Sequence, residues 1–128
     1  MSIEGNKITM FLRDNRTLAL TVNDEDRTPV DLDDCKLWFT VKQRTSYPDA
    51  NALLMKKNTA AGGDDTQIKV LTPTTDGQAE VYLVPTDTDA VNPGVYVYDV
   101  QVTLANGKTY TITRDQIVFK EDVTKTKT

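Results

Sequence analysis

The residues of this chain that could do chemistry are carboxylates and a single thiol, because the sequence contains no histidine. Carboxylates are concentrated between Asn23 and Asp34, and oxygen ligands at alternate positions of such a loop could hold Ca²⁺. The loop lacks the glycine-centred ligand spacing of an EF-hand. We therefore interpret residues 23–34 as a solvated acidic loop, with calcium binding as the alternative.

Other chemical arrangements are incomplete as well. Gly62-Gly63 resembles a phosphate-binding glycine loop only superficially, because no Lys-Ser/Thr ending and no helix follow it. Cys35 is the single cysteine, so no intrachain disulfide can form, and we expect a small buried hydrophobe, with a reactive thiol as the alternative. A general base would have to be a carboxylate or a lysine, and no paired arrangement is evident. We therefore expect no enzyme, no metal centre and no cofactor.

Length and charge limit the possible partners. A chain of 128 residues fits one domain with one core. Its formal net charge of −4 gives no electrostatic basis for binding phosphate backbones, so we do not expect nucleic-acid binding. No apolar run approaches the ~20 residues that span a bilayer, and residues 1–7 lack the apolar centre of a signal peptide. We expect synthesis in the cytoplasm and no membrane partner.

Two strand-like runs between Asn92 and Phe119 have the clearest pattern and predict a β-hairpin. Apolar residues alternate with polar ones along the first run, as in a half-buried strand. Beyond Arg114 the apolar positions change from even to odd numbers, which predicts a β-bulge near Asp115-Gln116. The inward side chains of the first run are expected to be Tyr96, Tyr98, Val100, Val102 and Leu104.

The turn of this hairpin can be chosen by its register. A two-residue loop at Asn106-Gly107 would mix core and solvent faces. A three-residue loop at residues 105–107, with Gly107 in the left-handed conformation, instead opposes apolar positions on the two strands. The expected pairs are Val102 with Tyr110 and Val100 with Ile112.

The segment Asn92-Pro93-Gly94-Val95-Tyr96 matches the pattern Asp/Asn-x-Gly-x-Tyr that leads into the sixth strand of immunoglobulin-like sandwiches. It resembles a tyrosine corner, in which the hydroxyl bonds to backbone a few residues upstream. We therefore expect the Tyr96 hydroxyl to reach a backbone group between Thr86 and Asn92. An antibody domain would have cysteine two positions later, where this chain has Tyr98.

The remaining alternation predicts six further strands and one helical turn. Within them Tyr82 faces outward, and Trp38 has outward parity with packing at the core edge as its alternative. The predicted fold is all-β, a single immunoglobulin-like antiparallel β-sandwich over residues 1–122, followed by a polar tail at 123–128. The expected strands are 7–12, 17–22, 35–41, 52–56, 67–71 and 78–84, with the helical turn at 85–90.

Several stretches spread over most of the chain together resemble small tailed-phage structural proteins with an immunoglobulin-like sandwich, similar to the N-terminal domain of baseplate upper proteins. Such proteins commonly have glycine where Arg27 stands and a Thr-Gly pair where Asp33-Asp34 stand. The stretches are Leu18-Ala19-Leu20-Thr21-Val22, Thr28-Pro29-Val30-Asp31-Leu32, Leu37-Trp38-Phe39-Thr40-Val41-Lys42, Pro48-Asp49-Ala50, Gly77-Gln78-Ala79, residues 93–102 and Asp122-Val123-Thr124.

The resemblance implies a non-enzymatic virion structural protein that is made in the host cytoplasm and acts through protein–protein interfaces in a capsid or a tail and baseplate assembly. Its partners would be other phage structural proteins and copies of itself. The alternative is a carbohydrate-binding adhesion module on the same sandwich, because exposed aromatic side chains also suit sugar stacking. The candidate interface residues are Trp38, Tyr47, Tyr82, Val123, Lys125 and Lys127.

Overall fold

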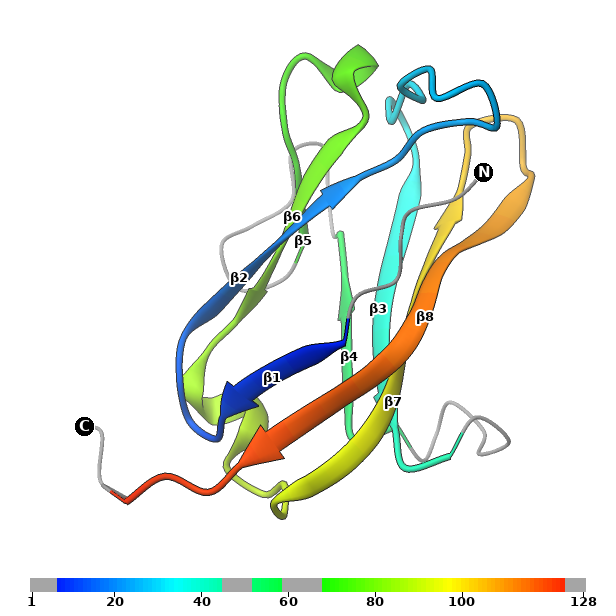
Figure 1. Ribbon diagram of the computed structural model, residues 1–128. Helices are drawn as coiled ribbons and strands as arrows, with labels where there is room; N and C mark the ends of the chain where they lie inside the picture. Colours follow the sequence, from blue (N-terminus) through cyan, green and yellow to red (C-terminus); the bar gives the residue numbers. More distant parts are fainter. Residues whose placement is uncertain (1–6, 45–51, 59–67, 124–128) are drawn as a thin grey trace.

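Two β-sheets form the protein in a computed structural model that describes residues 7–44, 52–58 and 68–123 (Figure 1). The larger sheet has the strand order β1-β8-β7-β3-β4, formed by Ile8–Phe11, Thr109–Lys120, Gly94–Thr103, Lys36–Lys42 and Leu54–Lys57. The smaller sheet has the order β2-β6-β5, formed by Arg16–Thr21, Gln78–Leu83 and Ile68–Val70. The only helical segments within the described residues are two 3₁₀ turns, η2 at Thr74–Asp76 and η3 at Pro85–Thr88.

This strand order is that of an immunoglobulin-like sandwich, with β8, β7 and β3 facing β2, β6 and β5. The prediction of an all-β sandwich is therefore confirmed. The prediction that it is antiparallel is wrong for one pair, because β1 runs parallel to β8, with Ile8 opposite Ile117. No turn joins these two strands directly, so nothing local forces them into opposite directions.

The core lies between the sheets and is built by the alternation read from the sequence. Leu37, Phe39 and Val41 on β3 are fully buried, and Cys35 is buried immediately before that strand. Strands β6 and β7 contribute their own alternate residues to the same layer. The largest fully buried side chains are Phe39, Phe119, Leu12, Leu32, Leu37, Ile68, Leu83, Ile117, Val22, Val41, Val81 and Val100.

The turn between β7 and β8 is the predicted three-residue loop. The Gly107 N–H donates to the Leu104 carbonyl at 2.8 Å, and the Leu104 N–H donates to the Lys108 carbonyl at 2.9 Å. Gly107 has φ of 86°, the left-handed region that favours glycine. Val102 lies opposite Tyr110, so this part of the register prediction is confirmed.

The bulge in β8 lies closer to the turn than the sequence predicted. Val100 lies opposite Thr113 rather than Ile112, and the register shifts between Val100 and Gln101. The ladder is continuous at Asp115 and Gln116, so the predicted bulge there is wrong. Ile112 and Thr113 are both buried, because the extra residue points two successive side chains into the core. The polar character of Thr113 concealed this position in the sequence.

The tyrosine corner forms as predicted. The Tyr96 hydroxyl donates to the Asn92 carbonyl at 2.6 Å, and the side chain is buried. Its ring packs against that of Phe119 with centroids 5.7 Å apart. The expected helical turn between β6 and β7 is the 3₁₀ turn η3.

Candidate interaction surface

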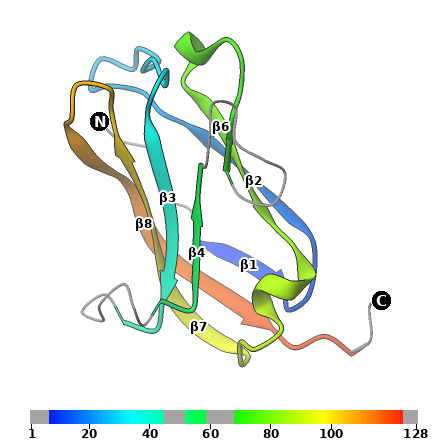
Figure 2. The same cartoon turned by 180° about the vertical axis from the view of Figure 1, so that it is seen from behind.

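The outer face of the larger sheet has a groove around Trp38. Trp38 is half-buried on β3 and lies between Lys57 of β4 and Gln101 of β7 in the ladder, and Figure 2 shows β4 beside β3 at that edge. We call this surface the Trp38 face, meaning the outward side chains of β4, β3, β7 and β8. The groove has a volume of about 410 Å³ and is lined by Trp38, Thr40, Lys42, Met55, Asp99, Gln101, Thr103 and Thr109.

Polar side chains on the Trp38 face are already linked to one another. The Gln101 amide donates to the Asp99 carboxylate at 3.2 Å. The Thr103 and Thr109 hydroxyls lie 2.8 Å apart across the β7–β8 ladder. A smaller hollow continues along the same strands past Asp99 to Arg114. The groove therefore combines an aromatic surface with a fixed polar border.

The charges on the Trp38 face are mostly positive. Asp99 is its one carboxylate among the described residues of these strands that point outward. The bases are Lys36, Lys42, Lys57, Arg114 and Lys120, all of which except Lys42 are exposed. Met55 on the edge strand is also exposed, at 39%. An anionic partner with an apolar anchor would match this surface.

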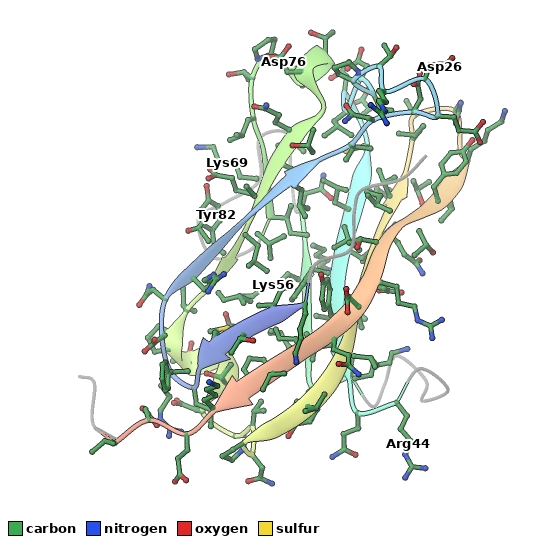
Figure 3. The ribbon with its side chains drawn as sticks, viewed as in Figure 1. Asp26, Arg44, Lys56, Lys69, Asp76 and Tyr82 are labelled. Carbon is green, nitrogen blue, oxygen red and sulfur yellow. The ribbon has the colours of Figure 1, made fainter. Side chains whose placement is uncertain are left out.

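Tyr82 lies on the opposite side of the sandwich from Trp38. It points outward from β6 in the smaller sheet, opposite Thr17 of β2, and its hydroxyl donates to Glu80 at 2.8 Å (Figure 3). Trp38 and Tyr82 therefore belong to two different surfaces of the sandwich. Val123 is 97% exposed after the end of β8. Of the remaining candidates, Tyr47, Lys125 and Lys127 lie outside the described residues, as does the Gly62-Gly63 loop.

The acidic loop uses two of its carboxylates to fix its own backbone, and the Asp31 side chain accepts a hydrogen bond from the Asp33 N–H at 3.0 Å. The Asp24 side chain accepts hydrogen bonds from the N–H groups of Asp26 and Thr28, each at 2.9 Å. Across the described residues, no group of three or more histidine, cysteine, aspartate or glutamate side chains is placed to hold a metal ion. The described geometry supplies no ligand set for Ca²⁺.

Cys35 is buried, and the Asn58 side-chain amide bonds to the backbone at Cys35 and Leu37. Burial raises the pKa of the Cys35 thiol from 9.0 to about 11. The Cys35 backbone carbonyl accepts from the Asn58 side-chain amide at 2.8 Å, and the Asn58 side-chain oxygen accepts from the Leu37 N–H at 2.6 Å. A protonated thiol inside the core is a poor nucleophile, which favours the packing interpretation over the reactive one.

A buried ion pair that the sequence did not suggest joins β4 to η3. The Lys56 ammonium lies 2.9 Å and 2.8 Å from the two Asp87 carboxylate oxygens, and the lysine is only 3% exposed. Asp87 also accepts from the Val84 N–H at 2.8 Å. Two adjacent lysines at the end of an apolar run read as solvent-facing, so only the inward parity of Lys56 opposite Phe39 could have indicated the pair. The pair links the edge strand β4 to η3, which lies in the segment that joins the smaller sheet to the larger one.

A second ion pair fixes the chain at the end of the sandwich. The Arg13 guanidinium donates to both oxygens of Asp122, and the Arg13 N–H donates to the Thr88 hydroxyl at 2.6 Å. The hydrogen bond to Asp122 raises the pKa of Arg13. Asp122 is buried whereas the next residue, Val123, is almost fully exposed. The chain therefore keeps side-chain contacts with the sandwich two residues beyond the end of β8, as far as Asp122.

Comparison of the sequence with protein-family models and with curated proteins finds no match. Within the described residues, no helix is both long and apolar enough to cross a bilayer.

Proposed function

We propose that this protein is a non-enzymatic structural component of a tailed-phage virion and that it acts through protein–protein interfaces with other virion proteins and with copies of itself. The observation that carries the proposal is the Trp38 face. Tryptophan, methionine and arginine are enriched in protein interfaces. Here Trp38 and Met55 line the groove, and Arg114 lines the smaller hollow beside it on the same outer sheet face. The proposed docking residues on this face are Trp38, Met55 and Arg114.

Backbone conformation supports the resemblance to phage structural proteins. Arg27 and Asp34 have φ of 63° and 55°, in the left-handed region that non-glycine residues rarely adopt. These are two positions at which the resembled proteins commonly have glycine, which adopts this region without strain. The chain thus keeps the backbone geometry expected of such a loop while its side chains differ.

Particle incorporation tests the proposal. Trp38→Ala is expected to fold and to enter virions at a reduced copy number, because the aromatic anchor of the interface is lost. Copy number would be measured in purified particles by quantitative mass spectrometry, and folding by circular dichroism. Tyr82→Ala is the matched control, since it removes an aromatic side chain from the other outer face. Absence of the unaltered protein from particles would contradict the proposal.

Glycan binding is the second candidate function, favoured by the same groove. A sugar ring could stack on Trp38 while Asp99 and Gln101 accept and donate hydrogen bonds at its border. A stable monomer that binds a glycan in calorimetry, and loses that binding in Trp38→Ala, would replace the virion proposal with an adhesion module.

A further inference from the structure

One end of the sandwich gathers acidic side chains. The β2–β3 loop and η2 lie together there, because the Leu32 N–H donates to the Thr74 carbonyl at 3.0 Å, and Figure 3 shows Asp26 and Asp76 at this same end. We call this surface the acidic end. Arg27 is the only base within these two segments. The acidic residues are Asp24, Glu25, Asp26, Asp31, Asp33, Asp34 and Asp76, all exposed except Asp24.

The backbone beneath the acidic end is held firmly. The Val22 N–H donates to the Gly77 carbonyl at 2.7 Å, and the Val30 N–H donates to the Val22 carbonyl at 2.9 Å. Gly77 has φ of 65°, and a Cβ built there would lie 2.5 Å from the Val22 carbonyl oxygen. The carboxylates therefore project from a fixed scaffold, which lowers the ordering cost of docking.

The acidic end and the Trp38 face have opposite charge on one chain. Lys36, Lys57 and Arg114 are exposed on the face, and the end is almost entirely acidic. With a formal net charge of −4, two copies repel each other in most orientations. Contact between the face of one copy and the end of another is the orientation in which the local charges attract. The half-buried Trp38 and exposed Met55 supply apolar area within the same contact.

We infer that the Trp38 face docks the acidic end of a second copy of this chain. The two surfaces differ, so the contact is heterologous and leaves the pair with one unused face, on one copy, and one unused end, on the other. Repetition of such a contact builds a ring or a filament. A specific contact of this kind should bury more than about 1,000 Å² in total. The inference rests on the proposed function, for which it specifies the partner and the two surfaces.

Charge reversal with mixing tests the inference. A face variant carries Lys36→Glu and Arg114→Glu, and an end variant carries Asp26→Lys and Asp76→Lys; all four residues are exposed. Sedimentation velocity over a concentration series at low salt should show self-association of the unaltered chain. Each variant alone should associate at least about tenfold more weakly, which corresponds to about 1.4 kcal/mol. An equimolar mixture should restore association, because each variant then meets a complementary surface on the other.

The control variant carries Lys69→Glu and Arg44→Glu, which make the same change in net charge as the face variant but lie outside the strands of the Trp38 face and outside the acidic end (Figure 3). It should associate as the unaltered chain does, and raised salt should dissociate all complexes. Circular dichroism would establish folding. If the face variant fails to fold, Lys36→Gln with Arg114→Gln replaces it, and if the end variant fails to fold, Asp26→Asn with Asp76→Asn replaces it. Weakened association is the expected result for either replacement.

An unaltered chain that stays monomeric at low salt overturns the inference, as does a mixture that fails to restore association. The proposed function is tested separately by particle incorporation. A monomeric chain that still enters particles overturns self-docking alone. A self-associating chain that is absent from particles overturns the virion function while the contact itself stands.

Discussion

Trp38 on the outer face of the larger sheet and Tyr82 on the outer face of the smaller sheet are both half-buried aromatic side chains. Around Trp38 there is a groove with a polar border, on a face whose exposed charges are basic. Tyr82 instead bonds through its hydroxyl to Glu80 on its own strand, and the neighbouring strand exposes Thr17 and Ala19. Parity in the sequence treats the two aromatic residues alike. The difference shows that outward parity alone does not indicate whether neighbouring strands shape a groove around an aromatic side chain.

The largest expected effect comes from breaking the ion pair behind the Trp38 face. Lys56→Ala leaves the Asp87 carboxylate without its ammonium partner and should lower the free energy of unfolding by about 3 kcal/mol. Because Lys56 lies in the edge strand β4, self-association should weaken as well. Urea denaturation would measure the stability change.

Lys69→Ala in the edge strand β5 is the control for this change. Its side chain is half-buried on the outer face of the smaller sheet, and stability should change by less than about 0.5 kcal/mol. If the two variants lost equal free energy of unfolding, the Lys56–Asp87 ion pair would not be what stabilises the β4 edge.

A smaller effect is expected in the core that both faces share. Cys35→Ser should lower the free energy of unfolding by about 1–2 kcal/mol, because a hydroxyl replaces an apolar thiol at a buried position. Association through the Trp38 face should persist once the variant is folded. Loss of assembly with intact folding would instead indicate a functional thiol.

The raised pKa of Cys35 also predicts a pH dependence. The unfolded chain loses the thiol proton near pH 9, whereas the folded chain retains it until about pH 11. Between these values the unfolded state binds fewer protons, so the contribution of Cys35 to stability is complete below pH 9 and falls as pH rises. Denaturation of the unaltered chain and of Cys35→Ser across this window should show a steeper loss in the unaltered chain.

The tyrosine corner gives a further, smaller effect. Tyr96→Phe removes the hydrogen bond to the Asn92 carbonyl and should cost about 1 kcal/mol. The ring remains packed on Phe119, so neither outer face should change in binding. Thermal unfolding would measure the cost, and an unchanged midpoint would show that the corner does not stabilise this fold.

The sequence predicted features whose cause is local. Alternation located the strands, and the pattern ending in Tyr96 located the corner and the segment that holds its acceptor, because both depend on residues close together in the chain. The buried Thr113 in the bulge and the Lys56–Asp87 pair depend on which strands lie opposite each other. Alternation places a side chain on one side of a sheet and does not identify the element that faces it. For the same reason it did not separate the surfaces of Trp38 and Tyr82.

The smallest expected effect belongs to the face without a groove. Tyr82→Phe removes the hydroxyl that donates to Glu80, and this half-exposed bond should change stability by less than about 0.5 kcal/mol. Association and particle incorporation should equal those of the unaltered chain, because the ring and its exposed neighbours remain. Parallel measurement of Trp38→Phe gives the contrast, since a smaller ring in the groove should weaken association. If Tyr82→Phe impaired assembly as strongly as Trp38→Phe, both faces would contact partners and the functional distinction between them would fail.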